Sequence, residues 1–308
     1  MGIVVLGAVF IDIKGHAAGT YIPTGRNVGS VSEVHGGVSR NVVEDIANVE
    51  LRPTFVSLVD DSAIGASVLE KLNNHKVDTR FMRRTPDGMG KWLAIFDGQG
   101  DLVASISKRP DLSAINDILD EEGDEIFKDA DSIAIEIDME KDTIKRVFKF
   151  AEKYNLKVYA AVSNMSIAVE RRDFLKNVEC FVCNEQEAGM LFMDDYSEKS
   201  PEELQDILKT KIQGAQIKKM IVTLGGKGAV YADIEGNTGF VPARKVDVKD
   251  TAGAGDSFFA GVTIGLTYGK SIVEACEIGS TLAASVIVTN ESVCPRFLPS
   301  EFGLNVEE

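Results

Sequence analysis

Long apolar runs and an excess of positive charge are both missing from this sequence. The apolar runs, at residues 133–137 and 286–288 for example, are far too short to cross a bilayer, which takes about 20 residues. The formal net charge is −15 at pH 7, and such a surface repels the phosphate backbone of nucleic acids. The sequence therefore predicts a protein that neither spans a membrane nor binds DNA or RNA.

Histidine and cysteine are also scarce, with three and four residues respectively. The histidines, His16, His35 and His75, have no ligand-like spacing among themselves, which argues against a zinc site. Cys180 and Cys183 lie in an apolar stretch typical of a strand, where alternation would point the two thiols to different sides. We therefore expect buried, reduced cysteines rather than a metal or redox pair.

The beginning of the chain shows no targeting pattern. Residues 1–7 form an apolar run that enters a glycine turn, without a basic leader or a cleavage site, and the Ser or Thr that myristoylation needs is absent. We expect a cytoplasmic protein. The length of 308 residues suits one large α/β domain with a small appendage or two ordinary domains, and we expect a single domain over 1–308.

From about residue 113 onward, short β-branched runs alternate with helical patterns. The predicted strands are 132–137, 157–161, 179–183 and 219–223, and the predicted helices are 141–154, 167–176, 185–191, 201–213, 256–269 and 272–288. Strand, helix and strand at this spacing indicate βαβ units, so we expect an α/β fold with a parallel sheet covered on both faces. Ligands of such sheets bind at the carboxyl ends of the strands.

Two segments interrupt this rhythm. Residues 13–35 are glycine-rich with alternating apolar positions, and residues 91–107 read as two short strands around the turn Asp97-Gly-Gln-Gly-Asp101. Together they could form a small sheet that stands off the main domain. Two interpretations remain open: a lid over a pocket, or an extension of the edge of the main sheet.

A run of small residues precedes the predicted helix at 256–269. Its amides could lie bare at the helix N-terminus, where they would bind an anion such as phosphate. The residues concerned are Ala252, Gly253, Ala254 and Gly255. Asp256 then stands in the first turn, within reach of a docked group, and could accept a proton from an attacking hydroxyl. The alternative is an ordinary helix cap in which Asp256 only favours the helix dipole.

Four short motifs follow one another along the chain. They are Gly-Gly-Val-Ser-Arg-Asn at 36–41, Asn-Glu-Gln-Glu at 184–187, Thr-Leu-Gly-Gly-Lys-Gly at 223–228 and Asp-Thr-Ala-Gly-Ala-Gly-Asp-Ser-Phe at 250–258. They resemble, in that order, the first signature, the Asn-x-x-Glu element, the nucleotide-binding loop and the second signature of the ribokinase-like (PfkB) family. This resemblance, from residue 4 to about 289, implies an ATP-dependent kinase with a three-layer α/β sandwich, a mostly parallel central sheet and a small β-sheet lid.

The resemblance also implies residue roles on the acceptor side. Asp256 would deprotonate the substrate hydroxyl, and the amides at 252–255 would form the anion hole. The implied substrate-binding residues are Asp12, Gly36, Gly37 and Asn41. Asp12 would hold substrate hydroxyls, and the two glycines would form the hinge of the lid, because glycine permits the backbone angles that a moving junction needs.

On the donor side, the resemblance implies ATP and Mg²⁺ as cofactors, and K⁺ as a further one. The implied ATP-binding residues are Thr223, Gly225, Gly228 and Asn184. Glu187, with Asn184, would position magnesium through water. Asp250 and the carbonyl of Ala252 resemble the potassium site. Such parts suit phosphoryl transfer, which depends on a positioned hydroxyl, a metal and fixed dipoles more than on covalent chemistry.

One position departs from the family pattern. Many relatives have an aspartate at the end of the strand that here ends in Ala161. Either that carboxylate is dispensable for this substrate or the active site is reduced, and the intact signatures favour the former.

The substrate is suggested by finer similarities. Arginine immediately before Asn41 is a feature in which the chain resembles bacterial pseudouridine kinases, whereas typical ribokinases and fructokinases have alanine at this position. The segments 12–19, 24–31 and 91–103 resemble the same group. This implies phosphorylation of the 5′-hydroxyl of pseudouridine. A sugar kinase for free ribose or a ketose is one alternative, and a nucleotide-binding regulator without catalysis is another. Asp256 and the glycine cradle argue against the regulator.

The small sheet also suggests an assembly. Its strands would expose unpaired edges and the apolar side chains of Trp92, Ile95 and Phe96. We therefore expect a homodimer formed through the lid.

Overall fold

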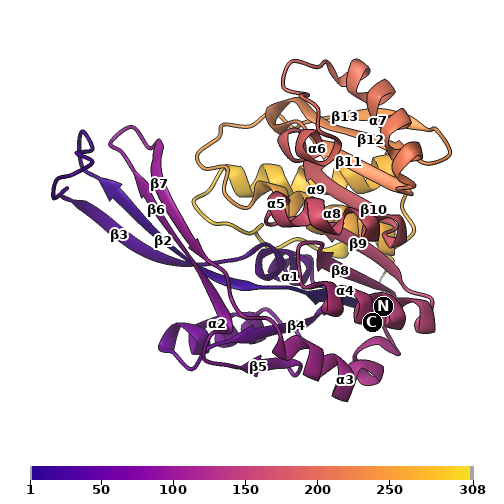
Figure 1. Cartoon of the computed structure of the whole chain (residues 1–308), viewed down its shortest axis with the longest axis horizontal. Coiled ribbons are helices and arrows are strands. Elements are labelled where there is room, and N and C mark those ends of the chain that lie inside the picture. Colours follow the sequence, from indigo (N-terminus) through magenta and orange to yellow (C-terminus); the bar gives the residue numbers. More distant parts are fainter. Residues whose placement is uncertain (1, 306–308) are drawn as a thin grey trace.

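The computed structural model describes residues 2–305, and a large twisted sheet runs through its centre (Figure 1). The strand order is β13-β12-β11-β10-β9-β8-β1-β4-β5. The strands are β1 (Ile3–Leu6), β4 (Thr54–Val59), β5 (Met82–Arg84), β8 (Ser132–Glu136), β9 (Lys157–Ala161), β10 (Cys180–Asn184), β11 (Lys219–Thr223), β12 (Gly228–Asp233) and β13 (Thr238–Pro242). Neighbours pair in parallel except β11 with β12 and β12 with β13. The mostly parallel sheet is confirmed.

Helices cover both faces of this sheet, which makes three layers (Figure 1). One face packs against α1 (Val38–Asn48), α2 (Ala63–Asn74), α8 (Ala254–Thr267) and α9 (Ile272–Ile287). The other packs against α3 (Ala114–Phe127), α4 (Lys141–Tyr154), α5 (Met165–Ala168), α6 (Glu185–Phe192) and α7 (Pro201–Ala215). Strand side chains alternate between the two cores, so Cys180 faces the first core and Cys183 the second. Both are buried free thiols, as expected.

A second sheet of four strands lies apart from the main one, in the order β3-β2-β6-β7 (Figure 1, left). Its strands are β2 (Val9–Ala17), β3 (Gly29–Gly36), β6 (Met89–Phe96) and β7 (Leu102–Lys108). We call it the small sheet. It contains both segments that interrupt the α/β rhythm, and β2 pairs in parallel with β6 across a long sequence separation. The small sheet is therefore separate from the main sheet and does not extend its edge.

Most of the predicted elements of the second half occur within a few residues of their expected ends, with one exception. The predicted helix at 167–176 is instead the short α5 followed by a 3₁₀ helix, Val169–Asn177. Only Leu175 of that 3₁₀ segment is buried. Tertiary packing of an apolar face supplies most helical stability in proteins, and this segment has almost no such face.

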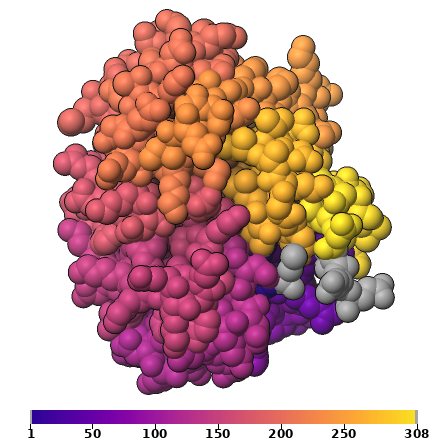
Figure 2. Space-filling model, turned by 90° about the vertical axis from the view of Figure 1, so that its right-hand side faces the viewer, coloured from indigo at the N-terminus to yellow at the C-terminus, as the bar shows by residue number. Residues whose placement is uncertain are grey.

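The end of the molecule away from the small sheet has a surface formed almost entirely by segments coloured magenta to yellow (Figure 2). Within residues 2–305, no helix is both long enough and apolar enough to pass through a bilayer.

Candidate active site

The N-terminus of α8 is built on a glycine that no other residue could replace without strain. Gly253 caps the helix in the left-handed region, with φ of 79°, and a Cβ there would overlap the backbone carbonyl of Ser292. The helix then begins at Ala254 without a side-chain cap. No capping side chain therefore satisfies the first amides of α8.

Fewer amides are free to bind an anion at this loop than the sequence predicted. The amide of Ala252 donates to Asp250 Oδ1 at 2.9 Å, and that of Ala254 donates to the carbonyl of Thr251 at 3.3 Å. Within the described part of the chain, the amides of Gly253 and Gly255 have no acceptor. Two of the four expected amides therefore remain free to bind an anion, with the positive end of the α8 dipole behind them.

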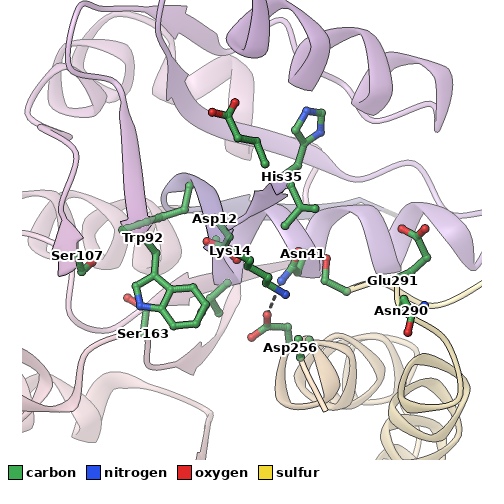
Figure 3. Close-up of a pocket in the computed structure, with 18 of the residues that line it drawn as sticks. Asp12, Lys14, His35, Asn41, Trp92, Ser107, Ser163, Asp256, Asn290 and Glu291 are labelled. Carbon is green, nitrogen blue, oxygen red and sulfur yellow. Dashed lines mark hydrogen bonds between the residues drawn. The ribbon is translucent and has the colours of Figure 1, made fainter. Parts of the chain in front are cut away.

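Asp256, in the first turn of α8, is held by a residue from α1. Asn41 Nδ2 donates to Asp256 Oδ2 at 2.6 Å, as the dashed line in Figure 3 shows. Burial raises the pKa of Asp256 to about 7, although the hydrogen bond from Asn41 opposes the shift. If Asp256 is the base of a proton transfer, the rate of that reaction should rise with pH through about 7, because a carboxylate accepts a proton only when ionised. This value lies near the operating pH, which suits a general base.

A cavity of about 700 Å³ opens between the small sheet and this helix end. Asp12, Val34, Trp92 and Ser107 are cross-strand neighbours in the small sheet, and all four line the cavity. In Figure 3, Asp12 and Trp92 lie on the same side of the small sheet as Asp256. We call this space the acceptor cavity. It brings together the predicted residues Asp12, Gly37, Asn41, Ala252, Gly253 and Asp256.

The two glycines at 36–37 make a close approach between strands possible. A Cβ on Gly36 would lie 2.6 Å from the carboxyl group of Asp12, and one on Gly37 would lie 2.7 Å from the carbonyl of Ala8. Gly37 also has φ of 99°, which a side chain would make strained. Both positions lie where β3 leaves the small sheet and α1 begins.

A second cavity, of about 430 Å³, lies on the other side of the α8 N-terminus and is mostly apolar. The predicted residues Thr223, Gly225 and Gly228 line it together with Ala254 and Gly255. Residues of the segment 243–248 and of α9 complete the wall. We call it the donor cavity. Its apolar wall and its contact with bare helix amides suit a base and a phosphate chain, respectively.

A smaller cavity, of about 200 Å³, shares Asp256 with the acceptor cavity and Gly255 with the donor cavity. Asn184 and Glu187 also face it. These two form a reciprocal capping box at the start of α6, with both hydrogen bonds at 2.8 Å. The motif therefore has a structural role as well as any ligand role. Burial raises the pKa of Glu187.

The described residues contain no group of three or more His, Cys, Asp or Glu side chains that could hold a metal ion. Magnesium commonly keeps several waters and binds through one or two carboxylates plus substrate phosphates. A single carboxylate at Glu187, beside the free amides of α8, fits that mode.

Sequence reasoning missed a buried acidic pair at the end of β8. Glu136 Oε1 accepts the amides of Ala8 and Ser39, both at 3.1 Å, and burial raises its pKa. Asp138, two residues on, is paired with Arg109 of the acceptor cavity at 3.0 Å. The sequence did contain a signal for this pair, because the stretch Ile-Glu-Ile-Asp at 135–138 places two carboxyl groups at the carboxyl end of a buried strand, where ligands of parallel sheets bind.

Ala161 is buried at the end of β9 and lines the small cavity beside Asp256. One carboxylate, that of Glu136, is thus present on the neighbouring strand β8, and Asp138 follows it, although β9 lacks a carboxylate. Asp250 is turned back on its own loop toward the amide of Ala252.

Comparison with known proteins gives a consistent result. Residues 2–298 match the model of the pfkB family carbohydrate kinases. The chain is 33% identical to a guanosine-inosine kinase of Exiguobacterium acetylicum, over 94% of this chain and 95% of that protein. It is 24% identical to a pseudouridine kinase of Escherichia coli, over 94% and 92%. The fold matches an Arabidopsis thaliana ribokinase in complex with ribose and ATP, with a TM-score of 0.82 and 20% identity over 99% of both chains.

Proposed function

Because this chain belongs to the pfkB family of carbohydrate kinases, we propose that it transfers the γ-phosphate of ATP to the 5′-hydroxyl of a ribonucleoside. Members of this family are phosphotransferases that act on hydroxyl groups of sugars and nucleosides, and ribokinase-like kinases use ATP with Mg²⁺. The nucleoside, the residue roles and the assembly are the proposed part.

One observation carries the residue roles. The acceptor cavity and the donor cavity meet at the N-terminus of α8, where Asp256 lines the first and Gly255 lines the second. A hydroxyl in one cavity and a terminal phosphate in the other would then face each other across two free amides. In-line transfer requires this arrangement.

On the acceptor side, Asp256 accepts the proton of the attacking hydroxyl, and Asn41 fixes the carboxylate in position. Asp12 holds ribose hydroxyls from the opposite wall. The amides of Gly253 and Gly255 stabilise charge on the transferred phosphoryl group. Glu187 and Asn184 would hold magnesium through water, and the bound ion would neutralise charge on the phosphates. The small sheet acts as a lid that excludes water, with Gly36 and Gly37 as its hinge.

The acceptor cavity favours a nucleoside over a free sugar. A pentose would leave most of about 700 Å³ unfilled. The indole ring of Trp92 lies on the cavity side of β6 in Figure 3, and aromatic rings stack well on nucleobases. We therefore place the ribose between Asp12 and Asp256, with the base toward Trp92.

Two bases are candidates. Identity of 33% with a guanosine-inosine kinase supports a purine nucleoside. The arginine before Asn41 and 24% identity with a pseudouridine kinase support pseudouridine. The higher identity makes guanosine or inosine our first candidate and pseudouridine our second.

A substrate panel tests this proposal. With ATP and Mg²⁺, we expect the preferred nucleoside to exceed ribose and fructose in kcat/KM by at least roughly 30-fold, the ratio given by two polar contacts to the base, of about 1–3 kcal/mol each, that a free sugar cannot make. Trp92→Ala should reduce this ratio, whereas Trp92→Phe should keep most of it. Ribose or fructose preferred over every nucleoside would eliminate the nucleoside proposal and leave the kinase chemistry intact.

We propose a homodimer through the small sheet, on grounds that differ from those expected. Trp92 faces the acceptor cavity, and Ile95 and Phe96 are half-buried, so the most exposed apolar side chains of the small sheet are other residues. The opposite face carries the apolar side chains instead: Val31 is 75% exposed, Ile106 69% and Leu93 39%. Leu93 and Ile106 are cross-strand partners, and all of edge strand β7 is exposed. A second copy of the small sheet would cover this face.

Light scattering at micromolar concentration should give the mass of a dimer, and Ile106→Asp should convert it to a monomer. Leu298→Asp is the matched control, because Leu298 is 54% exposed but lies outside the small sheet, and it should leave the dimer intact. A wild-type monomer would contradict the proposal.

We retain a potassium site at Asp250 and the carbonyl of Ala252 as part of the proposal. Asp250 belongs to the loop that leads into the cradle and accepts a hydrogen bond within it. A cation there would stabilise the loop from which the free amides project.

A further inference from the structure

Arg40 is buried at a junction of three parts of the molecule. It is 1% exposed and does not line the acceptor cavity. Its Nη1 donates to Glu44 Oε2 at 2.6 Å, and its Nη2 donates to the carbonyl of His35 and, at 3.2 Å, to Ser292 Oγ. One guanidinium thus connects the end of β3, the helix α1 and the segment after α9.

Ser292 links Arg40 to Asn41, the residue that holds the proposed catalytic base. Its hydroxyl accepts from Arg40 and donates to Asn41 Oδ1 at 3.4 Å. The amide group of Asn41 is therefore oriented with its oxygen toward Ser292 and its nitrogen toward Asp256. Rotation of that amide by 180° would place an oxygen against the carboxylate, so the orientation decides whether Asp256 receives a hydrogen bond.

The same guanidinium contacts the proposed hinge. The carbonyls of His35 and Gly36 accept from Arg40, the latter at 3.4 Å from Nε. These are the last two residues of β3, immediately before Gly37. If the small sheet moves about Gly37, either Arg40 moves with it or the hydrogen bonds from Arg40 to the carbonyls of His35 and Gly36 break.

The charge of Arg40 is balanced within the protein. Glu44 is fully buried and also pairs with Lys71 at 2.9 Å. The charged groups that influence Asp256 are Glu136, Arg40 and Asp12, and Asp45 lies close enough for Asp256 to raise the pKa of Asp45 in turn. Among those acting on Asp256, Arg40 lowers its pKa whereas Glu136 and Asp12 raise it.

We propose that Arg40 and Ser292 are positioning residues: through the amide of Asn41 they align Asp256 according to the position of the hinge. The inference rests on the proposed function, since it takes Asp256 as the base. It gives Arg40 a role that needs no contact with the substrate. It also makes base alignment and closure of the small sheet parts of one hydrogen-bonded unit.

Ser292→Ala removes the link between Arg40 and Asn41 with little change in volume. We expect kcat to fall about tenfold, equivalent to about 1.4 kcal/mol, with KM for ATP unchanged. The midpoint of the acid limb of kcat/KM should move upward from the wild-type value near 7, because a freely rotating Asn41 donates less to the carboxylate. Ser292→Thr keeps a hydroxyl and should restore both values. Ser285→Ala is a change in α9 at a hydroxyl that bonds, among residues 2–305, to the carbonyl of Leu282 alone, and it should alter neither value.

A double-mutant cycle separates a shared link from two independent effects. Arg40→Lys keeps the charge but cannot reach Glu44, His35 and Ser292 together, so it should also lower kcat. The pair Arg40→Lys and Ser292→Ala should be no slower than the slower single variant. Additive losses would overturn the inference, as would a Ser292→Ala protein of lowered Tm with an unchanged pH profile. If Asp256→Asn kept full turnover, the base assignment itself would fail, which is a separate outcome.

Discussion

Asp256→Asn should lower kcat by roughly 10²–10⁴-fold, the range associated with loss of a general base. The amide has nearly the size of the carboxyl group but cannot accept the hydroxyl proton. The fold and ATP binding should persist, because the donor cavity does not include the Asp256 side chain. Steady-state kinetics, calorimetry with ATP and thermal unfolding provide the three measurements.

Asp117→Asn is the matched control for that variant. Asp117 is exposed and lies in the first turn of α3, as Asp256 lies in the first turn of α8. If Asp256 served only the helix dipole, both changes would cost a similar 0.3–1 kcal/mol of stability, by the rough scale of such effects, and neither would affect turnover. Near wild-type turnover in Asp256→Asn would remove Asp256 from the mechanism.

Gly255→Val should lower kcat by about 10²–10³-fold, comparable to loss of an anion-hole donor. A Cβ on Gly255 meets no protein atom within 4 Å, so the fold should tolerate the change. The added side chain projects into space that we assign to the phosphates, since Gly255 lines both the donor cavity and the small cavity with Glu187. We expect an unchanged Tm together with weakened ATP binding.

Gly214→Ala provides the comparison. Gly214 also has open space around its Cβ position but lies near the end of α7, away from the three cavities. Its activity should equal the wild type, and its stability should rise by about 0.5–1 kcal/mol because alanine favours a helix over glycine. Full activity in Gly255→Val would contradict the phosphate cradle.

Local pattern was sufficient to predict the elements whose apolar faces repeat regularly. The helix Lys141–Tyr154 and the strands Lys157–Ala161 and Lys219–Thr223 occur at their expected ends. Each is bounded by a change from helical to alternating periodicity, which is a local signal. The motif at 250–258 likewise predicted the helix N-terminus, although two of its four amides turned out to bond within the loop.

Features that depend on long-range contacts could not be predicted in this way. The separation of the small sheet follows from the parallel pairing of β2 with β6, residues about eighty positions apart, and no local period encodes such a partner. The Arg109–Asp138 pair and the contact of Arg40 with Ser292 also join distant segments. The resemblance singled out Arg40 as a marker of substrate class, but Arg40 is buried and does not line the acceptor cavity.

The two cavities that meet at the N-terminus of α8 are lined by different stretches of the sequence. The acceptor cavity is walled mainly by residues 10–109, and the donor cavity by residues 223–287. Under the proposed function, substitutions in the first set should change which hydroxyl compound is accepted and leave nucleotide binding unchanged. The walls of the two cavities could therefore change independently of each other, since they come from different stretches of the sequence.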